Sequence, residues 1–234
     1  MALFVWREGE SLPPVSADDE TATLDLLVTE RDDLVSEATR LCNHLHQFLL
    51  QLDPGYRERI PSLTSKRGVL AALSYESDDP RPLQQERGGA VRRLARRLWL
   101  VVEQEREIAH RIERSATARF APLTEICGIS LLTAGALAGI PGPGLRFSSD
   151  AQIAAYAGVA PLEASSAERV RHRLARGGNR RLNAILYRIA ITQARCSPET
   201  RAYLARRVAE GKTKREALQQ LREQLSRASG ARHQ

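Results

Sequence analysis

Two adjacent serines, Ser165 and Ser166, stand immediately before the most basic stretch of the sequence. A serine hydroxyl can attack a phosphodiester and form a phosphoserine bond, provided that it loses its proton and that cations offset the charge of the transition state. Arginine meets the second requirement because its planar guanidinium pairs with two phosphate oxygens at once. The basic residues near the serines are Arg169, Arg171, His172, Arg173, Arg176, Arg180 and Arg181.

The charge distribution favours a polyanionic partner for this stretch. Residues 163–234 hold 17 Lys and Arg against 6 Asp and Glu, whereas residues 1–162 are net acidic, with 18 against 22. A cationic module of this kind is typical of nucleic-acid binding, although a solvated basic face without a partner also fits it. From the residue types alone, a turn serine beside a nucleic-acid-binding loop is the simpler interpretation of Ser166.

A second candidate contact with nucleic acid is the tripeptide Gly128-Ile129-Ser130, which lies between two apolar segments. Helix-hairpin-helix modules use such a turn to point backbone N–H groups at a phosphate. Their usual pattern is glycine, hydrophobe, glycine, and because serine replaces the second glycine here, a tight turn between packed helices fits as well. Gly128, Ser130 and Asn179, the predicted N-cap of the next amphipathic helix, therefore join the basic residues as predicted nucleic-acid-binding positions.

The elements that must position these residues are predicted to be helices. From Leu24 to Leu52, nine positions recur in steps of three and four, and eight of them are apolar, with Arg31 as the exception. A second stripe runs from Val91 to Ile112, with Glu105 as its polar exception. Two long striped helices predict either an antiparallel helical hairpin within the chain or a dimerising coiled coil, and both alternatives remain open.

The predicted fold class is all-α, with a long helical hairpin followed by a compact helical domain. The predicted organisation is an irregular lead-in at 1–16, a coiled-coil region at 17–119, a DNA-binding domain at 120–228 and a disordered tail at 229–234. The boundary follows a shift to small apolar residues after Ala121-Pro122. The only strand signal is a loose alternation of polar and apolar residues over 169–174.

Several protein classes do not fit the sequence. No apolar run is long enough to span a membrane, and the acidic N-terminal segment does not resemble a secretion signal. Three widely spaced cysteines without a CxxC pair argue against a disulfide framework and against zinc, and they suit a cytoplasmic protein. Neither a P-loop nor a HExxH pattern is present, and no metal site is predicted.

The segments ICGISLLTAGALAG and RFSSDAQIAAYAGVAPLEASSAERVRHRLARGGNRRLNAILYRIA carry a resemblance to a known family. Their ordered pattern resembles the C-terminal transposase domain of the insertion-sequence one-ten family of RNA-guided serine recombinases. The helical half, including RDDLVSEATRLCNHLHQFLLQLDP, is similar to the coiled coil that precedes this domain. The resemblance therefore covers nearly the whole chain.

The resemblance implies roles for individual residues. Ser166 corresponds to the family's nucleophile, and Ser165 is its neighbour. Ala167 stands where the family has a glycine, as Ser130 does in the hairpin turn, and alanine does not tolerate all the backbone angles that glycine does. Family members carry a RuvC-like nuclease domain whose carboxylates bind Mg²⁺. Because no such segment precedes Met1, we expect a truncated transposase that binds nucleic acid, holds no cofactor itself and is inactive alone.

The expected partners are DNA, a guide RNA and further copies of the chain, as a homodimer or higher oligomer through the coiled coil. One alternative is a helical oligomerisation or regulatory protein that pairs with full-length transposase and does no chemistry. Another is a general helix-hairpin-helix DNA binder that needs neither RNA nor a coiled-coil partner. A membrane partner is not expected.

Overall fold

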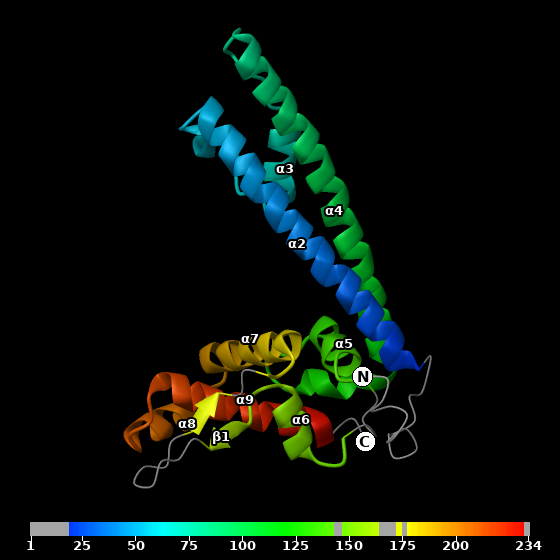
Figure 1. Cartoon of the computed structure of the whole chain (residues 1–234), viewed down its shortest axis with the longest axis vertical. Coiled ribbons are helices and arrows are strands. Elements are labelled where there is room, and N and C mark those ends of the chain that lie inside the picture. The colour runs from blue at the N-terminus through cyan, green and yellow to red at the C-terminus, as the bar shows by residue number, and fades with distance from the viewer. Residues whose placement is uncertain (1–18, 143–146, 164–171, 175–176, 232–234) are drawn as a thin grey trace, which may run out of the picture. The chain divides into compact units, whose positions relative to one another are not determined.

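The computed structural model describes residues 19–142, 147–163, 172–174 and 177–231 (Figure 1). Apart from one short pair of strands, the elements of this part are helices, which confirms the predicted all-α fold class. The α-helices are α2 (Glu20–Leu52), α3 (Lys66–Leu73), α4 (Pro82–Phe120), α5 (Leu131–Gly139), α6 (Asp150–Tyr156), α7 (Arg180–Cys196), α8 (Pro198–Ala209) and α9 (Lys214–Ala231). Two 3-10 helices, η2 (Tyr56–Glu58) and η3 (Ala121–Glu125), complete the helical elements.

The chain divides into two compact units. Residues 29–111 form the first, called here the hairpin unit, and the described residues on either side of them form the second, the C-terminal unit. The beginning of α2 and the end of α4 therefore belong with the C-terminal helices, whereas the predicted bounds assign both helices to one domain. Helix α9 ends at Ala231, inside the segment predicted as a tail. The predicted lead-in at 1–16 lies outside the described residues.

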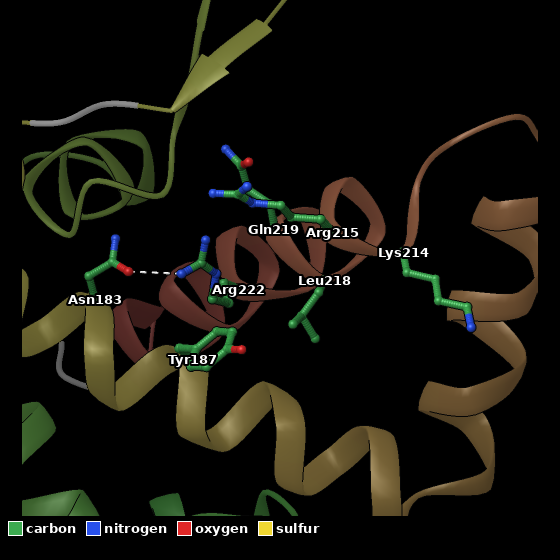
Figure 2. A pocket seen from close by; sticks show the side chains of 7 residues that line it. All are labelled: Asn183, Tyr187, Lys214, Arg215, Leu218, Gln219 and Arg222. Atoms are coloured by element: carbon green, nitrogen blue, oxygen red, sulfur yellow. Dashed lines mark hydrogen bonds between the residues drawn. The ribbon is translucent and has the colours of Figure 1, made fainter.

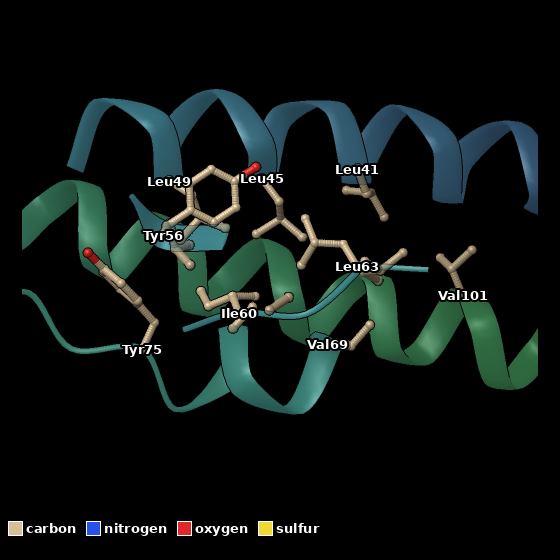
Figure 3. Packing of buried hydrophobic residues seen from close by; sticks show 13 residues of the cluster. Leu41, Leu45, Leu49, Tyr56, Ile60, Leu63, Val69, Tyr75 and Val101 are labelled. Carbon is tan, nitrogen blue, oxygen red and sulfur yellow. The ribbon is translucent and has the colours of Figure 1, made fainter. Parts of the chain in front are cut away.

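In the hairpin unit, α2 and α4 pack against each other along the two predicted stripes (Figure 3). The buried core also takes in η2, α3 and the residues around them. Its members are Leu41, Leu45, Leu49, Tyr56, Ile60, Leu63, Val69, Ala72, Tyr75, Val91, Ala95, Leu98 and Val101. The stripes are thus paired within one chain, as in the helical-hairpin alternative, and assembly of several copies through this region stays a prediction.

The polar exceptions of the two stripes form an ion pair with each other. The Arg31 guanidinium lies 2.6 Å from the Glu105 carboxylate, and the two side chains are only 26% and 21% exposed. A second ion pair joins Glu37 to Arg97 at 3.5 Å. Since the residue number rises along α2 while it falls along α4, these pairs show that the helices are antiparallel. A paired charge within an apolar interface also specifies the register of the two helices.

In the C-terminal unit, α5 packs closely on the ends of the long helices. Gly135 and Gly139 are four residues apart and share one face of α5. A Cβ atom at Gly135 would lie 2.5 Å from the side chain of Ile112, and one at Gly139 would lie 2.6 Å from the backbone nitrogen of Asp25. Larger residues would therefore push α5 away from α2 and α4, which explains why this segment is made of small apolar residues.

Side-chain caps begin three helices of the C-terminal unit, and one of them is the predicted cap Asn179. Asn179 caps α7 and Ser197 caps α8, each accepting a hydrogen bond at 3.1 Å from the N–H three residues on. Thr213 and Glu216 form a capping box at α9, and the Thr213 N–H donates to the Glu216 carboxylate at 2.8 Å. That hydrogen bond lowers the pKa of Glu216. Local sequence thus sets where α7, α8 and α9 start.

No helix in the described part of the chain has the length and apolar character that a membrane span requires. The three cysteines are free thiols, half-buried at Cys42 and exposed at Cys127 and Cys196.

Replacing Glu105 by leucine is expected to destabilise the hairpin unit, because it leaves Arg31 largely buried without its partner. The expected loss is about 1–2 kcal/mol in the free energy of unfolding, less than for a fully buried pair. The double variant R31L/E105L should recover most of this loss, since two leucines complete the apolar stripe. Urea denaturation of the wild type, both single variants and the double variant measures the coupling, and independent effects of the two changes would contradict the pairing.

Candidate nucleic-acid interface

The predicted nucleophile lies in the connection between two short paired strands. Strand β1 (Pro161–Glu163) pairs antiparallel with β2 (His172–Leu174), and Glu163 stands opposite His172. The pairing brings together the two ends of the segment 164–171. Of the predicted site residues, Ser165, Ser166, Arg169, Arg171 and Arg176 lie outside the described residues, and only the backbone is described for His172 and Arg173.

A direct backbone contact between Gly158 and Gly178 holds the base of this strand pair. Gly158 follows α6 and Gly178 precedes α7, and a Cβ atom on Gly178 would overlap the Cα and nitrogen atoms of Gly158. Beside this contact, the backbone N–H of Asn179 donates to the Tyr156 carbonyl at 2.7 Å. The Asn179 side chain donates to the Tyr156 hydroxyl at 2.9 Å. Both ends of the strand pair are therefore bound to the same pair of helices.

Asn183, in the first turn of α7, contacts both α6 and α9. Its Nδ2 donates to the carbonyl oxygens of Ala157 and Gly158 at 2.9 and 3.2 Å. Its Oδ1 accepts from the Arg222 guanidinium at 2.8 Å. Since both ends of the amide have partners, its orientation is determined by the network. Arg222 of α9 is thereby linked to the base of the strand pair.

The two predicted phosphate-binding residues at the start of α7 differ in their surroundings. Arg180 is exposed, whereas Arg181 is half-buried and its Nη1 lies 3.3 Å from the carboxylate of Asp25 on α2. A phosphate at Arg181 would compete with this acid for the guanidinium. Arg180 faces solvent, and phosphate contacts by both residues stay predictions.

The turn at 128–130 packs on α7. The side-chain amide of Gln193 donates to the carbonyl of Cys127 at 2.9 Å, immediately before the turn. The Ser130 hydroxyl accepts a hydrogen bond from the N–H three residues on and caps α5. The serine that replaces the second glycine of the usual hairpin pattern therefore has a structural task, while phosphate binding by Gly128 and Ser130 stays a prediction.

A groove between α7 and α9 is lined by cationic side chains and one aromatic ring, and Arg222 lies beside that ring (Figure 2). The lining of this α7–α9 groove is Asn183, Tyr187, Lys214, Arg215, Leu218, Gln219 and Arg222. The groove encloses about 570 Å³, within the range of small-ligand sites. The Arg222 guanidinium lies 5.6 Å from the centre of the Tyr187 ring. The lining thus combines three cations and one aromatic side chain, without a carboxylate.

Sequence reasoning missed this groove. Its one signal is helical spacing, because Asn183 and Tyr187 are four residues apart on α7, and Arg215 and Arg222 are seven apart on α9. Each pair shares a helix face. Which face of α7 meets which face of α9 depends on tertiary packing, and nothing in the sequence fixes that.

Residues 121–205 match a family model described as "Transposase IS116/IS110/IS902 family". The chain carries an IS116/IS110/IS902-family transposase domain. This result confirms the family that the residue pattern predicts. The matched residues of the transposase domain include α5, α6, the strand pair and α7, and they end within α8, so that α9 lies outside the match.

The chain is also similar to a protein of Streptomyces coelicolor (strain ATCC BAA-471 / A3(2) / M145) named "Insertion element IS110 uncharacterized 43.6 kDa protein". The two are 29% identical over 249 aligned residues, which cover 88% of this chain and 62% of the relative. The similarity therefore extends beyond the transposase domain. The chain spans less than two thirds of this relative's length.

The Gly158–Gly178 contact predicts a sharp difference between two neighbouring glycines. Gly178→Ala is expected to lower the free energy of unfolding by about 3 kcal/mol, because the new methyl group would overlap backbone atoms that have no free rotation. Gly177→Ala is the matched control, since a Cβ atom there meets nothing within 4 Å, and we expect a change of under about 1 kcal/mol. Denaturant unfolding compares the two, and equal stabilities would contradict the contact.

Proposed function

We propose that this chain binds the DNA of an insertion sequence and that Ser166 is the nucleophile of strand cleavage. The family match supports a transposase domain, and the excess of basic residues after residue 162 supports a polyanionic partner. The observation that carries the proposal is the base of the strand pair. There the Gly158–Gly178 contact and the Asn179 hydrogen bonds hold both ends of the predicted nucleophile segment to α6 and α7.

The proposed chemistry is a single transesterification. The Ser166 Oγ loses its proton and bonds to the phosphorus, and the bond from phosphorus to one sugar oxygen breaks, leaving a sugar hydroxyl that takes up a proton. Guanidinium groups from the basic segment, such as Arg169 and Arg171, offset the charge of the transition state. In the described part of the chain, no cluster of three His, Cys, Asp or Glu residues could hold a metal ion.

A guide RNA and assembly with further copies belong to the same proposal, since the family resemblance implies both. The buried stripes of α2 and α4 are already used within the hairpin unit. Contacts between copies would therefore use outward residues of that unit, among them Leu50 and Leu100, which are 57% and 58% exposed.

Binding of DNA by the purified chain is expected to weaken steeply as salt rises from about 50 to about 200 mM, because phosphate contacts release counterions. Arg180→Ala should reduce the slope of log affinity against log salt by roughly one. Arg40→Ala, an exposed arginine of the hairpin unit, serves as a control of equal charge and should leave the slope unchanged. Fluorescence anisotropy measures both. If Arg180→Ala leaves the salt slope unchanged, Arg180 does not contact a phosphate. If the chain inhibits a full-length relative without binding DNA, the regulatory alternative is favoured.

The role of Ser166 is tested by covalent trapping. The chain is mixed with element-end DNA, Mg²⁺ and a full-length relative whose own nucleophilic serine is replaced by alanine. We expect a protein–DNA adduct that survives detergent and maps to Ser166 by mass spectrometry. Ser166→Ala should abolish the adduct, and Ser165→Ala should retain it. An adduct that persists in the Ser166→Ala variant would refute the assignment.

A further inference from the structure

We propose that the α7–α9 groove binds a single-stranded segment of nucleic acid, with a phosphate at Arg215 and Arg222 and an unstacked base against Tyr187. This inference rests on the proposed function, because it names a contact surface of the same domain. It goes beyond the family match, since five of the seven lining residues come from α9, which the match does not include.

The positive charges that line the groove are not balanced by acidic side chains in its lining. Three of the seven lining residues are cationic and none is acidic. The two acids of α9 are already engaged, because Glu216 accepts hydrogen bonds from Thr213 and Glu223 pairs with Arg227 at 2.6 Å. Helix α7 contains no acidic residue. The cations of the groove therefore attract an anion from solution.

The guanidinium of Arg222 is held in place within the groove. Its Nη1 is bound to Asn183 at 2.8 Å, and the group lies over the Tyr187 ring, so that its position is set before any ligand arrives. Within the described part of the chain, its Nε has no hydrogen-bond partner and no acid pairs with it. Burial lowers the pKa of Arg222, its interaction with Tyr187 opposes this shift, and the charge of Arg215 adds to it. An anion in the groove would relieve both penalties.

Tyr187 is 44% exposed although it is a large aromatic residue. Aromatic side chains beside a cationic groove are the stacking surfaces that proteins use for unpaired bases. Bases within a duplex are stacked on each other and cannot offer a face to such a ring. The side chain of Leu218 adds apolar surface to the same groove. The combination therefore fits a single strand better than a duplex.

The groove lies beside the base of the strand pair. Asn183 lines the groove and also binds the carbonyl groups of Ala157 and Gly158, which lie just before β1. Arg180 stands three residues before Asn183 on the same face of α7 and is exposed. A strand in the groove would therefore lie beside the base of the strand pair that carries the predicted nucleophile segment.

The test compares short single-stranded DNA, single-stranded RNA and duplex DNA of one sequence by fluorescence anisotropy. Tyr187→Leu should weaken binding of single strands roughly five- to tenfold and leave duplex binding unchanged. Tyr187→Phe should bind as the wild type does, because it keeps the ring. Arg215→Ala should weaken single-strand binding and reduce its salt slope by about one. Arg188→Ala, the matched control on an exposed position of α7 outside the groove, should not change the ratio of single-strand to duplex affinity.

Photocrosslinking supplies a second readout that does not depend on the variants folding. An oligonucleotide carrying 5-iodouracil should crosslink to a peptide that contains Tyr187. Similar affinities for the DNA and RNA strands support contacts to the phosphate and to the face of the base. A higher affinity for one of the two identifies whether the groove binds DNA or RNA. If the wild type binds single strands but neither Tyr187→Leu nor Arg215→Ala weakens them and no crosslink forms, the groove assignment is overturned. A wild type that binds no nucleic acid would instead overturn the proposed function itself.

Discussion

The close approach of two backbones at Gly158 and Gly178 is the constraint on which the rest of the C-terminal unit depends. It fixes the distance between the end of α6 and the start of α7, and so it also fixes the base of the strand pair. The hydrogen bonds of Asn179 to Tyr156 are possible only at that separation. A side chain at Gly178 would separate the helices and break these bonds together.

Asn183 extends this constraint to α9. Its amide nitrogen donates hydrogen bonds to two carbonyl oxygens at the end of α6, and its amide oxygen accepts one from the Arg222 guanidinium. One side chain therefore connects the segment that carries the predicted nucleophile with the cationic groove. Under the proposals above, a strand that binds the groove and a phosphate that approaches Ser166 would be positioned by the same network.

Local sequence patterns were enough to predict the two long helices and the residue at which α7 begins. The stripes of α2 and α4 follow the helical period, and Asn179 caps α7 as its residue type predicts. Long-range pairings were not predictable in the same way. The sequence marks Arg31 and Glu105 as exceptions in their stripes, but their contact requires the register of an antiparallel pair. Tyr187 and Arg222 belong to different helices, and only packing brings them together.

The ion pair between Arg31 and Glu105 also restricts how the hairpin unit can evolve. If one helix slid along the other by a turn, both charges would face apolar side chains, and burying two unpaired charges costs several kcal/mol. An insertion in one helix between this pair and the connection that joins the two helices must therefore be matched by an equal insertion in the other helix. Insertions of seven residues, which preserve the apolar face, satisfy this condition best. Variation in hairpin length among relatives should accordingly be correlated between the two helices and occur in whole heptads.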